Sequence, residues 1–173
     1  MKKCWIVLLA LVMLTGCGQP AESETVSDVY APQQQQPAAR QIMVQLPPEA
    51  FTPVLQTERE SLYLCDRYSI SVGTYEAGDL QKTIQNATGY LPEDLQIQKT
   101  VQDGVSRYNF IWTAASEEGI QVGRSCILDD GNYHYVLTAM AEESVAGELQ
   151  STWHEVFSSF QLADKETDFN TGS

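Results

Sequence analysis

Cys17 is the residue whose surroundings point most directly to a chemical modification. It follows an apolar segment, residues 4–14, that lies behind the two positive charges of Lys2 and Lys3. A membrane-spanning helix needs about 20 apolar residues, so this segment is too short to span a bilayer. A short apolar run behind positive charge is typical of a secretory signal peptide. We therefore expect the chain to be exported.

The residues Leu14, Thr15, Gly16 and Cys17 resemble the lipobox of bacterial lipoproteins. The resemblance implies that a diacylglycerol is attached to the sulfur of Cys17 and that the chain is cut before it, so that residues 1–16 are the signal peptide. Two acyl chains hold a protein stably at a membrane. The expected location is the extracytoplasmic side of the cell membrane, through this lipid anchor. The alternative is a plain signal peptide with an incidental cysteine.

Cys65 and Cys126 are the cysteines of the region expected to fold. An even pair in an exported domain favours a disulfide, and two buried free thiols are the alternative. A reactive thiol is a third reading, because Arg124 lies on the same strand face as Cys126 and an arginine can lower the pKa of a thiol. The sequence places no histidine near Cys126, and we expect no catalytic residue there.

The histidines and the paired acidic residues do not form a recognisable catalytic or metal motif. His134 and His154 are expected at solvent-exposed positions, and the acidic pairs lack the spacing of a calcium loop. The sequence also lacks a nucleophile elbow, a phosphate-binding loop, a zinc-binding helix motif and a C-x-x-C pair. We therefore expect no catalytic residue, no metal and no cofactor. A small cell-envelope hydrolase or glycan-processing enzyme stays open as the alternative function.

Aromatic residues are the remaining indication of a binding site. Tyr108 and Trp112 alternate along one expected strand, and Tyr133 and Tyr135 along another. The first interpretation is a core packed against a helix. The second is a binding surface on an uncovered sheet face, because tyrosine combines a ring that packs with a hydroxyl that stays hydrated. Such a surface would bind an envelope protein or a glycan.

The charge and composition of the chain define its partners and its domains. A formal net charge of −13 repels nucleic acid, so we expect no nucleic-acid partner and contact with the membrane through the lipid anchor. Residues 17–40 have too few apolar groups to offset chain entropy, which predicts a lipidated cysteine followed by a disordered tether. Residues 163–173 are expected to form a disordered tail. The folded domain is then residues 41–162.

The pattern of the folded region predicts strands, a helix, a long meander and a final helix. Asp79 can cap the first helix and Gly89 can end it, and an apolar stripe predicts the last helix over residues 144–160. Alternating runs between glycine-containing turns predict an antiparallel meander. We expect an α+β fold, an antiparallel β-meander sheet packed with two helices. The expected strands are residues 42–46, 61–65, 68–75, 95–101, 108–114, 120–128 and 133–139.

This order of elements, with a last helix that ends in "VFSSFQL", is similar to the PsbP-like fold of small extrinsic photosystem proteins and of several bacterial lipoproteins. The stretch "GRSCILDDGNYHYVLTAMA" also resembles uncharacterised small bacterial lipoproteins. The resemblance implies binding and assembly roles and brings no catalytic motif. The leading hypothesis is a membrane-anchored, non-enzymatic binding or assembly module.

Overall fold

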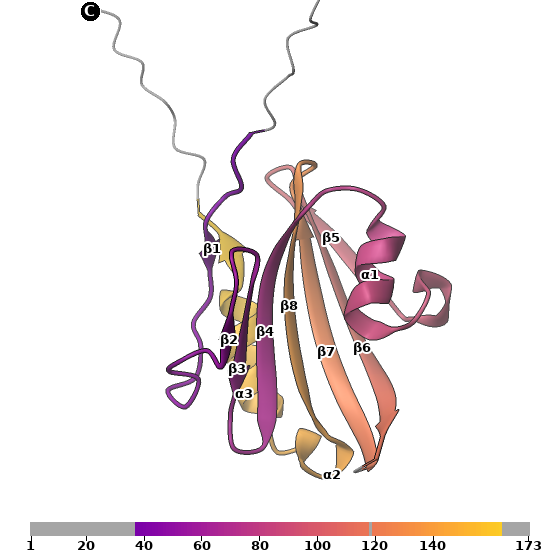
Figure 1. Ribbon diagram of the computed structural model, residues 1–173. Coiled ribbons are helices and arrows are strands. Elements are labelled where there is room, and N and C mark those ends of the chain that lie inside the picture. The colour runs from indigo at the N-terminus through magenta and orange to yellow at the C-terminus, as the bar shows by residue number, and fades with distance from the viewer. Residues whose placement is uncertain (1–36, 118, 164–173) are drawn as a thin grey trace, which may run out of the picture. The chain divides into compact units, whose positions relative to one another are not determined.

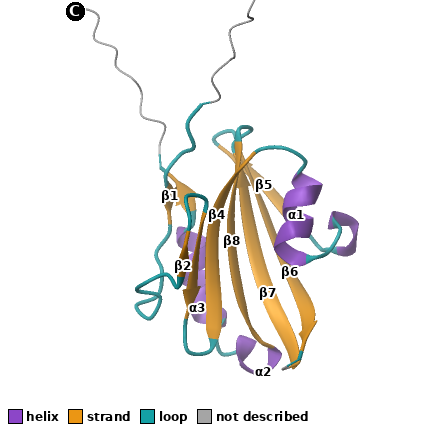
Figure 2. Ribbon diagram, viewed as in Figure 1, coloured by secondary structure: helices purple, strands orange, loops and turns teal. Residues whose placement is uncertain are grey.

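The computed structural model describes residues 37–117 and 119–163. In this part of the chain a large antiparallel sheet carries one helix on each face (Figures 1 and 2). The predicted signal peptide, the predicted lipidation site Cys17, the tether up to residue 36 and the tail from residue 164 lie outside the described residues. No helix in the described ranges combines the length and the apolar character that a membrane span requires.

The sheet has seven strands in the spatial order β2-β3-β4-β8-β7-β6-β5, and all neighbours are antiparallel. The predicted meander is formed by β5 to β8. Asp103 and Gly104 make the tight turn between β5 and β6, with φ angles of 51° and 76°, the conformation that two-residue hairpins require. The strands are β2 (Leu55–Gln56), β3 (Glu60–Leu64), β4 (Tyr68–Glu76), β5 (Gln98–Gln102), β6 (Val105–Ser116), β7 (Gly119–Asp129) and β8 (Tyr133–Glu142).

One face of the sheet, here called the α3 face, is covered by α3 (Gln150–Ser159). The single helix expected over residues 144–160 is in fact two, because the short α2 (Glu143–Ala146) ends at Gly147. Glycine is a poor helix former, and the break redirects the chain before α3 begins. The predicted apolar stripe is confirmed from Leu149 onward. Its buried members are Leu149, Trp153, Val156, Phe157 and Phe160.

The opposite face, here called the α1 face, is covered in part by α1 (Leu80–Thr88). As predicted, the Asp79 side chain accepts a hydrogen bond from the backbone N–H of Gln81 at 3.0 Å, and Gly89 ends the helix with φ of 82°. Ile84 packs from this helix onto the sheet. The α+β fold class, with helices packed on an antiparallel sheet, is therefore confirmed.

The expected strand at residues 42–46 is not part of the large sheet. Its first residues form β1 (Ile42–Met43), which pairs with β9 (Gln161–Leu162) in a sheet of two strands. The backbone N–H of Ala163 donates to Gln41 O at 2.9 Å, so this residue, which was assigned to the tail, is held in place. The two ends of the described chain therefore lie side by side (Figure 1).

Candidate functional site

The four aromatic residues of the predicted binding surface do not form one surface. Tyr108 and Trp112 lie on the α1 face, whereas Tyr133 and Tyr135 lie on the α3 face. Trp112 is 7% exposed and Tyr135 is fully buried. Alternation within each strand is as predicted, but the register between strands, which the sequence does not reveal, places the two pairs on opposite sides of the sheet.

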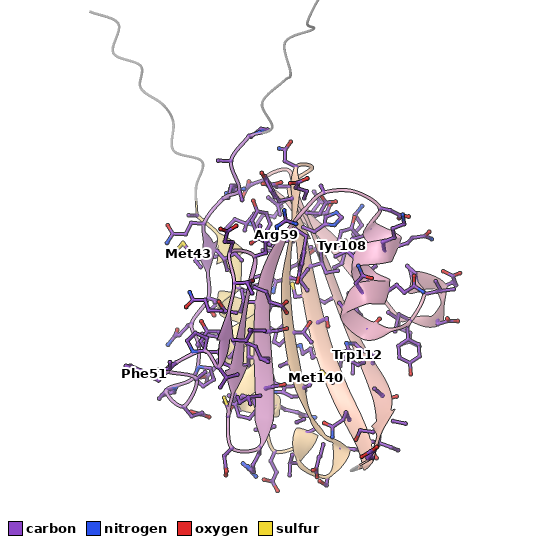
Figure 3. The ribbon with its side chains drawn as sticks, viewed as in Figure 1. Met43, Phe51, Arg59, Tyr108, Trp112 and Met140 are labelled. Atoms are coloured by element: carbon purple, nitrogen blue, oxygen red, sulfur yellow. The ribbon has the colours of Figure 1, made fainter. Side chains whose placement is uncertain are left out.

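Each buried ring of this set has a structural partner. The indole Nε1 of Trp112 donates to Ser125 Oγ at 3.0 Å, and its ring lies against Gly123, where a Cβ would come within 2.3 Å of it. In Figure 3 Trp112 and Met140 are seen from the side of the sheet that carries α1. The hydroxyl of Tyr135 accepts from the Arg40 backbone N–H at 2.7 Å and donates to Asp130 Oδ2 at 3.1 Å. These rings hold the domain together.

The predicted disulfide between Cys65 and Cys126 is absent, because both are free thiols. Cys65 lies in the loop between β3 and β4, and Cys126 lies on β7, with β4 and β8 between them in the sheet. Burial raises the pKa of the Cys126 thiol to about 11, and this outweighs the opposite effects of Arg107 and Arg124. The thiol is therefore protonated at neutral pH and is not a nucleophile of low pKa.

His134 is buried, contrary to the exposed position expected for it. It is 2% exposed, and its Nδ1 lies 2.8 Å from Thr83 Oγ1 of α1. Its Nε2 lies 4.0 Å from Asp129 Oδ1. Burial lowers the pKa of His134 despite the two neighbouring carboxylates of Asp129 and Asp130, so the ring is neutral at physiological pH. No group of three or more His, Cys, Asp or Glu side chains in the described residues could hold a metal ion.

Part of the outer edge of β6 has no partner strand in the described sheet. Val105 and Gln102 flank the tight turn, so alternate residues from Val105 onward direct their backbone N–H and C=O toward β5. However, the pairing with β5 ends at Asn109. The same alternation therefore points the backbone groups of Ile111, Thr113 and Ala115 outward, where no described strand pairs with them.

A hollow of about 760 Å³, here called the edge slot, lies along this open edge. One wall is formed by Tyr90 and residues 94–98, which lead into β5 and include its first residue, and the other by residues 109–113 with Arg124. The Tyr90 hydroxyl donates to Thr113 O at 2.6 Å, which is the bond expected of an outward-pointing carbonyl. Ile111 is 65% exposed beside it. The edge slot thus combines backbone groups that can form hydrogen bonds with an apolar side chain.

A second hollow of about 580 Å³, here called the α3 hollow, lies on the α3 face between β6–β7 and the α2–α3 segment. It meets the edge slot at Ile111 and Arg124, which line both. The Arg124 guanidinium carbon lies 4.5 Å from the ring centroid of Phe157. From the sequence, Arg124 was considered only for its effect on Cys126. Its apolar neighbours in the hollow are Ile111 and Val122.

No known protein family matches this chain, and no curated protein is similar to it. Solved structures that are similar to it include the following three. A Bacteroides thetaiotaomicron protein has 8% identity and a TM-score of 0.49, over 72% of this chain and 46% of that protein. The Ran-binding protein Mog1p of Saccharomyces cerevisiae has 15% identity and a TM-score of 0.47, over 71% of this chain and 90% of Mog1p. The cyanobacterial PsbP (CyanoP) of Synechocystis has 11% identity and a TM-score of 0.46, over 70% of this chain and 82% of CyanoP.

All three TM-scores are below 0.5, and these similarities assign neither a ligand nor a partner to this chain. The PsbP-like fold expected from the order of elements is represented among the three by CyanoP. The chain spans less than half of the Bacteroides protein.

Proposed function

We propose that this chain is a lipid-anchored, extracytoplasmic binding module that takes up an extended segment of an envelope protein as an added strand along β6. The observation that supports this function is the open edge at Ile111, Thr113 and Ala115. The first two of these residues line the edge slot, and Ala115 continues the same edge beyond it. An extended peptide that adds to a sheet edge gains affinity from main-chain hydrogen bonds and specificity from side-chain contacts.

The composition of the edge supports a binding role. Natural proteins protect edge strands with charged side chains, proline or bulges. Residues 108–116 carry no charge and no proline, in a chain whose net charge is −13. The other edge of the sheet differs, because β2 and its flanking loop bond to β3 there, with Val54 N–H to Leu62 O at 2.8 Å and Thr57 N–H to Glu60 O at 2.8 Å.

The shape of the edge slot favours a single extended segment over a second sheet. The wall formed by Tyr90 and residues 94–98 stands opposite the β6 edge, so the edge is not free on its outer side. A single strand fits between the two walls. The edge strand of another folded sheet would not fit, because the strands next to it would clash with the outer wall. The partner is therefore a flexible or terminal segment, and its entry requires the Tyr90 hydroxyl to leave Thr113 O.

The edge can be tested with an Ala115→Pro variant. Proline removes only the outward N–H and is tolerated on edge strands, so the fold should survive, and Ala115→Ser is the matched control. Linear peptides are selected from a random library on the full chain. Hydrogen exchange should then show protection of the amides of Ile111, Thr113 and Ala115, and Ala115→Pro should abolish peptide binding. Equal binding to both variants, or protection confined to other strands, would exclude the edge as the site.

The anchor requires a separate test, because Cys17 lies outside the described residues. Cys17→Ser should remove the protein from the fraction labelled with radioactive fatty acid and leave its precursor uncut. Unchanged labelling of this variant would refute the lipoprotein assignment without affecting the proposal for β6.

A further inference from the structure

We infer that the α3 hollow is a binding site for a small carboxylate with an apolar body, a site distinct from strand addition at the edge slot. Its volume of about 580 Å³ lies within the range of small-molecule pockets, which are mostly apolar with a few well-placed polar groups. The polar group that defines the ligand here is the guanidinium of Arg124. The other polar residues of the lining are Gln150, Ser151 and His154.

Arg124 is a cation without a protein acceptor. Within residues 37–117 and 119–163 its guanidinium has no ion pair and no hydrogen bond, and its described contact is the ring of Phe157. Its neighbour Arg107 differs, because it donates to the carbonyls of Phe157 and Phe160 at the end of α3, at 2.5 and 2.8 Å. Arg124 therefore retains its donors for a ligand, and a planar guanidinium suits a carboxylate in a bidentate arrangement.

Trp153 forms part of the wall of the α3 hollow and carries an N–H that can report on ligand binding. Its side chain is 5% exposed and lines the α3 hollow, and its Nε1 is the buried side-chain donor of the described residues that has no hydrogen-bond partner. The Nε1 atom itself is closed to solvent, so a ligand in the hollow packs against the indole ring and changes the environment of this N–H.

The remaining lining of the hollow favours an apolar anion. Its apolar walls come from Ile111, Val122 and Ala146, and none of its lining residues is acidic. That is unusual in a chain with 23 acidic residues. Arg107 near Arg124 adds to the positive potential, as its effect on the Arg124 pKa shows. The charge of the hollow and the apolar walls together match a carboxylate attached to a hydrocarbon body.

The test is a titration of the full chain with hexanoate, in which NMR monitors the indole N–H signal of Trp153. This signal is assigned by its absence from the spectrum of Trp153→Phe. Hexanoate should shift this signal in a saturable manner. Acetate lacks the apolar body and hexan-1-ol lacks the charge, so both should shift it far less. A response to hexan-1-ol as large as that to hexanoate would overturn the inference.

Arginine variants separate the hollow from general charge effects. Arg124→Gln should weaken hexanoate binding about 10-fold or more, the scale of one lost charge-assisted contact. Arg67→Gln removes an exposed arginine outside the hollow and should change little. If Arg124→Gln and Arg67→Gln bound hexanoate with equal affinity, and their equal urea midpoints showed that both are folded, the inference would be overturned. Ala115→Pro should leave hexanoate binding unchanged, because Ala115 does not line the hollow.

Discussion

In the described residues the α3 face of the sheet buries thirteen residues in one cluster, whereas the α1 face buries five. The buried polar residues show the opposite distribution between the two faces. The buried polar residues of the described chain, Thr88, Ser125, His134 and Thr138, all belong to α1 or to the sheet face beneath it. One face is thus an apolar core closed by a large aromatic stripe, and the other is a smaller core that incorporates hydrogen-bonded polar groups.

This difference separates the source of stability from the source of specificity. Apolar burial stabilises roughly in proportion to area, so most of the folding free energy comes from the α3 face. The buried hydroxyl groups of the α1 face add little net stability when they are paired. They are costly when a partner is lost, and they therefore favour one arrangement of α1 on the sheet.

The largest effect is expected from removal of the α3 stripe. Trp153→Ala should lower the free energy of unfolding by about 3–5 kcal/mol, because Trp153 is 5% exposed and packs in the larger cluster. A domain has only about 5–15 kcal/mol in total, so much of the population could unfold. Urea melts of the full chain would measure the change.

Glu148→Ala is the control for this variant. Glu148 forms an exposed ion pair with Arg67 at 2.5 Å, and such pairs contribute about 0–1 kcal/mol. If Trp153→Ala had the midpoint of the wild type, the α3 face would not be the main source of stability.

A smaller and more local effect is expected from α1. Ile84→Ala removes the buried contact of this helix, and such changes cost about 2–5 kcal/mol. We expect the lower end, because the cluster beneath α1 is small and its neighbours can relax into the space. Hydrogen exchange of α1 should rise more than that of β7 and β8. Equal acceleration in all three would mean that the two faces unfold as one unit.

The elements of both faces could largely be predicted from the sequence, and the reasons are local. Asp79 and Gly89 mark the ends of α1 through capping, and alternation along β6 to β8 assigns each side chain to a face within its strand. What could not be predicted depends on pairing between strands. The register that separates Trp112 from Tyr135 and the strand order that separates Cys65 from Cys126 are long-range properties.

The candidate site was missed for a related reason. The sequence "FIWTAAS" indicates a strand, but it does not reveal that this strand lacks an outer neighbour. The outer edge of β6 is open there because β5 begins only at Gln98, which pairs with Asn109. Arg124 lies two positions before Cys126, and its role depends on the neighbouring Phe157 and Trp153 of α3. The absence of charge along residues 108–116 is a signal that could have indicated an unusual edge.

An intermediate effect is expected from the polar chain on the α1 face. Trp112 Nε1 donates to Ser125 Oγ, which lies 3.0 Å from Thr138 Oγ1. Ser125→Ala would leave the buried indole N–H without an acceptor, at a cost of about 1–3 kcal/mol. Adding Trp112→Phe should recover part of this loss, since no donor is then left unpaired. If the double variant lost the sum of both single effects, the hydrogen bond would not couple the two residues.

The smallest effect concerns the pH dependence that His134 gives to the α1 face. Burial holds the pKa of His134 below its usual value of about 6.5. The unfolded chain therefore binds a proton at pH values where the folded chain keeps the ring neutral. Its contribution to stability is complete above about pH 6.5 and decreases as the pH falls from there toward the lowered pKa of the folded state.

His134→Gln cannot titrate in this range and can keep a hydrogen bond to Thr83. Urea midpoints measured between pH 7.5 and 5.5 should fall more steeply for the wild type than for this variant. The nearby carboxylates of Asp129 and Asp130 are the same in both proteins, so the difference in slope isolates the histidine. Parallel slopes would mean that His134 is protonated in the folded state as readily as in the unfolded chain. Burial on the α1 face would then not change the titration of the imidazole, and the polar groups that define this face would be the hydroxyl groups of Ser125 and Thr138.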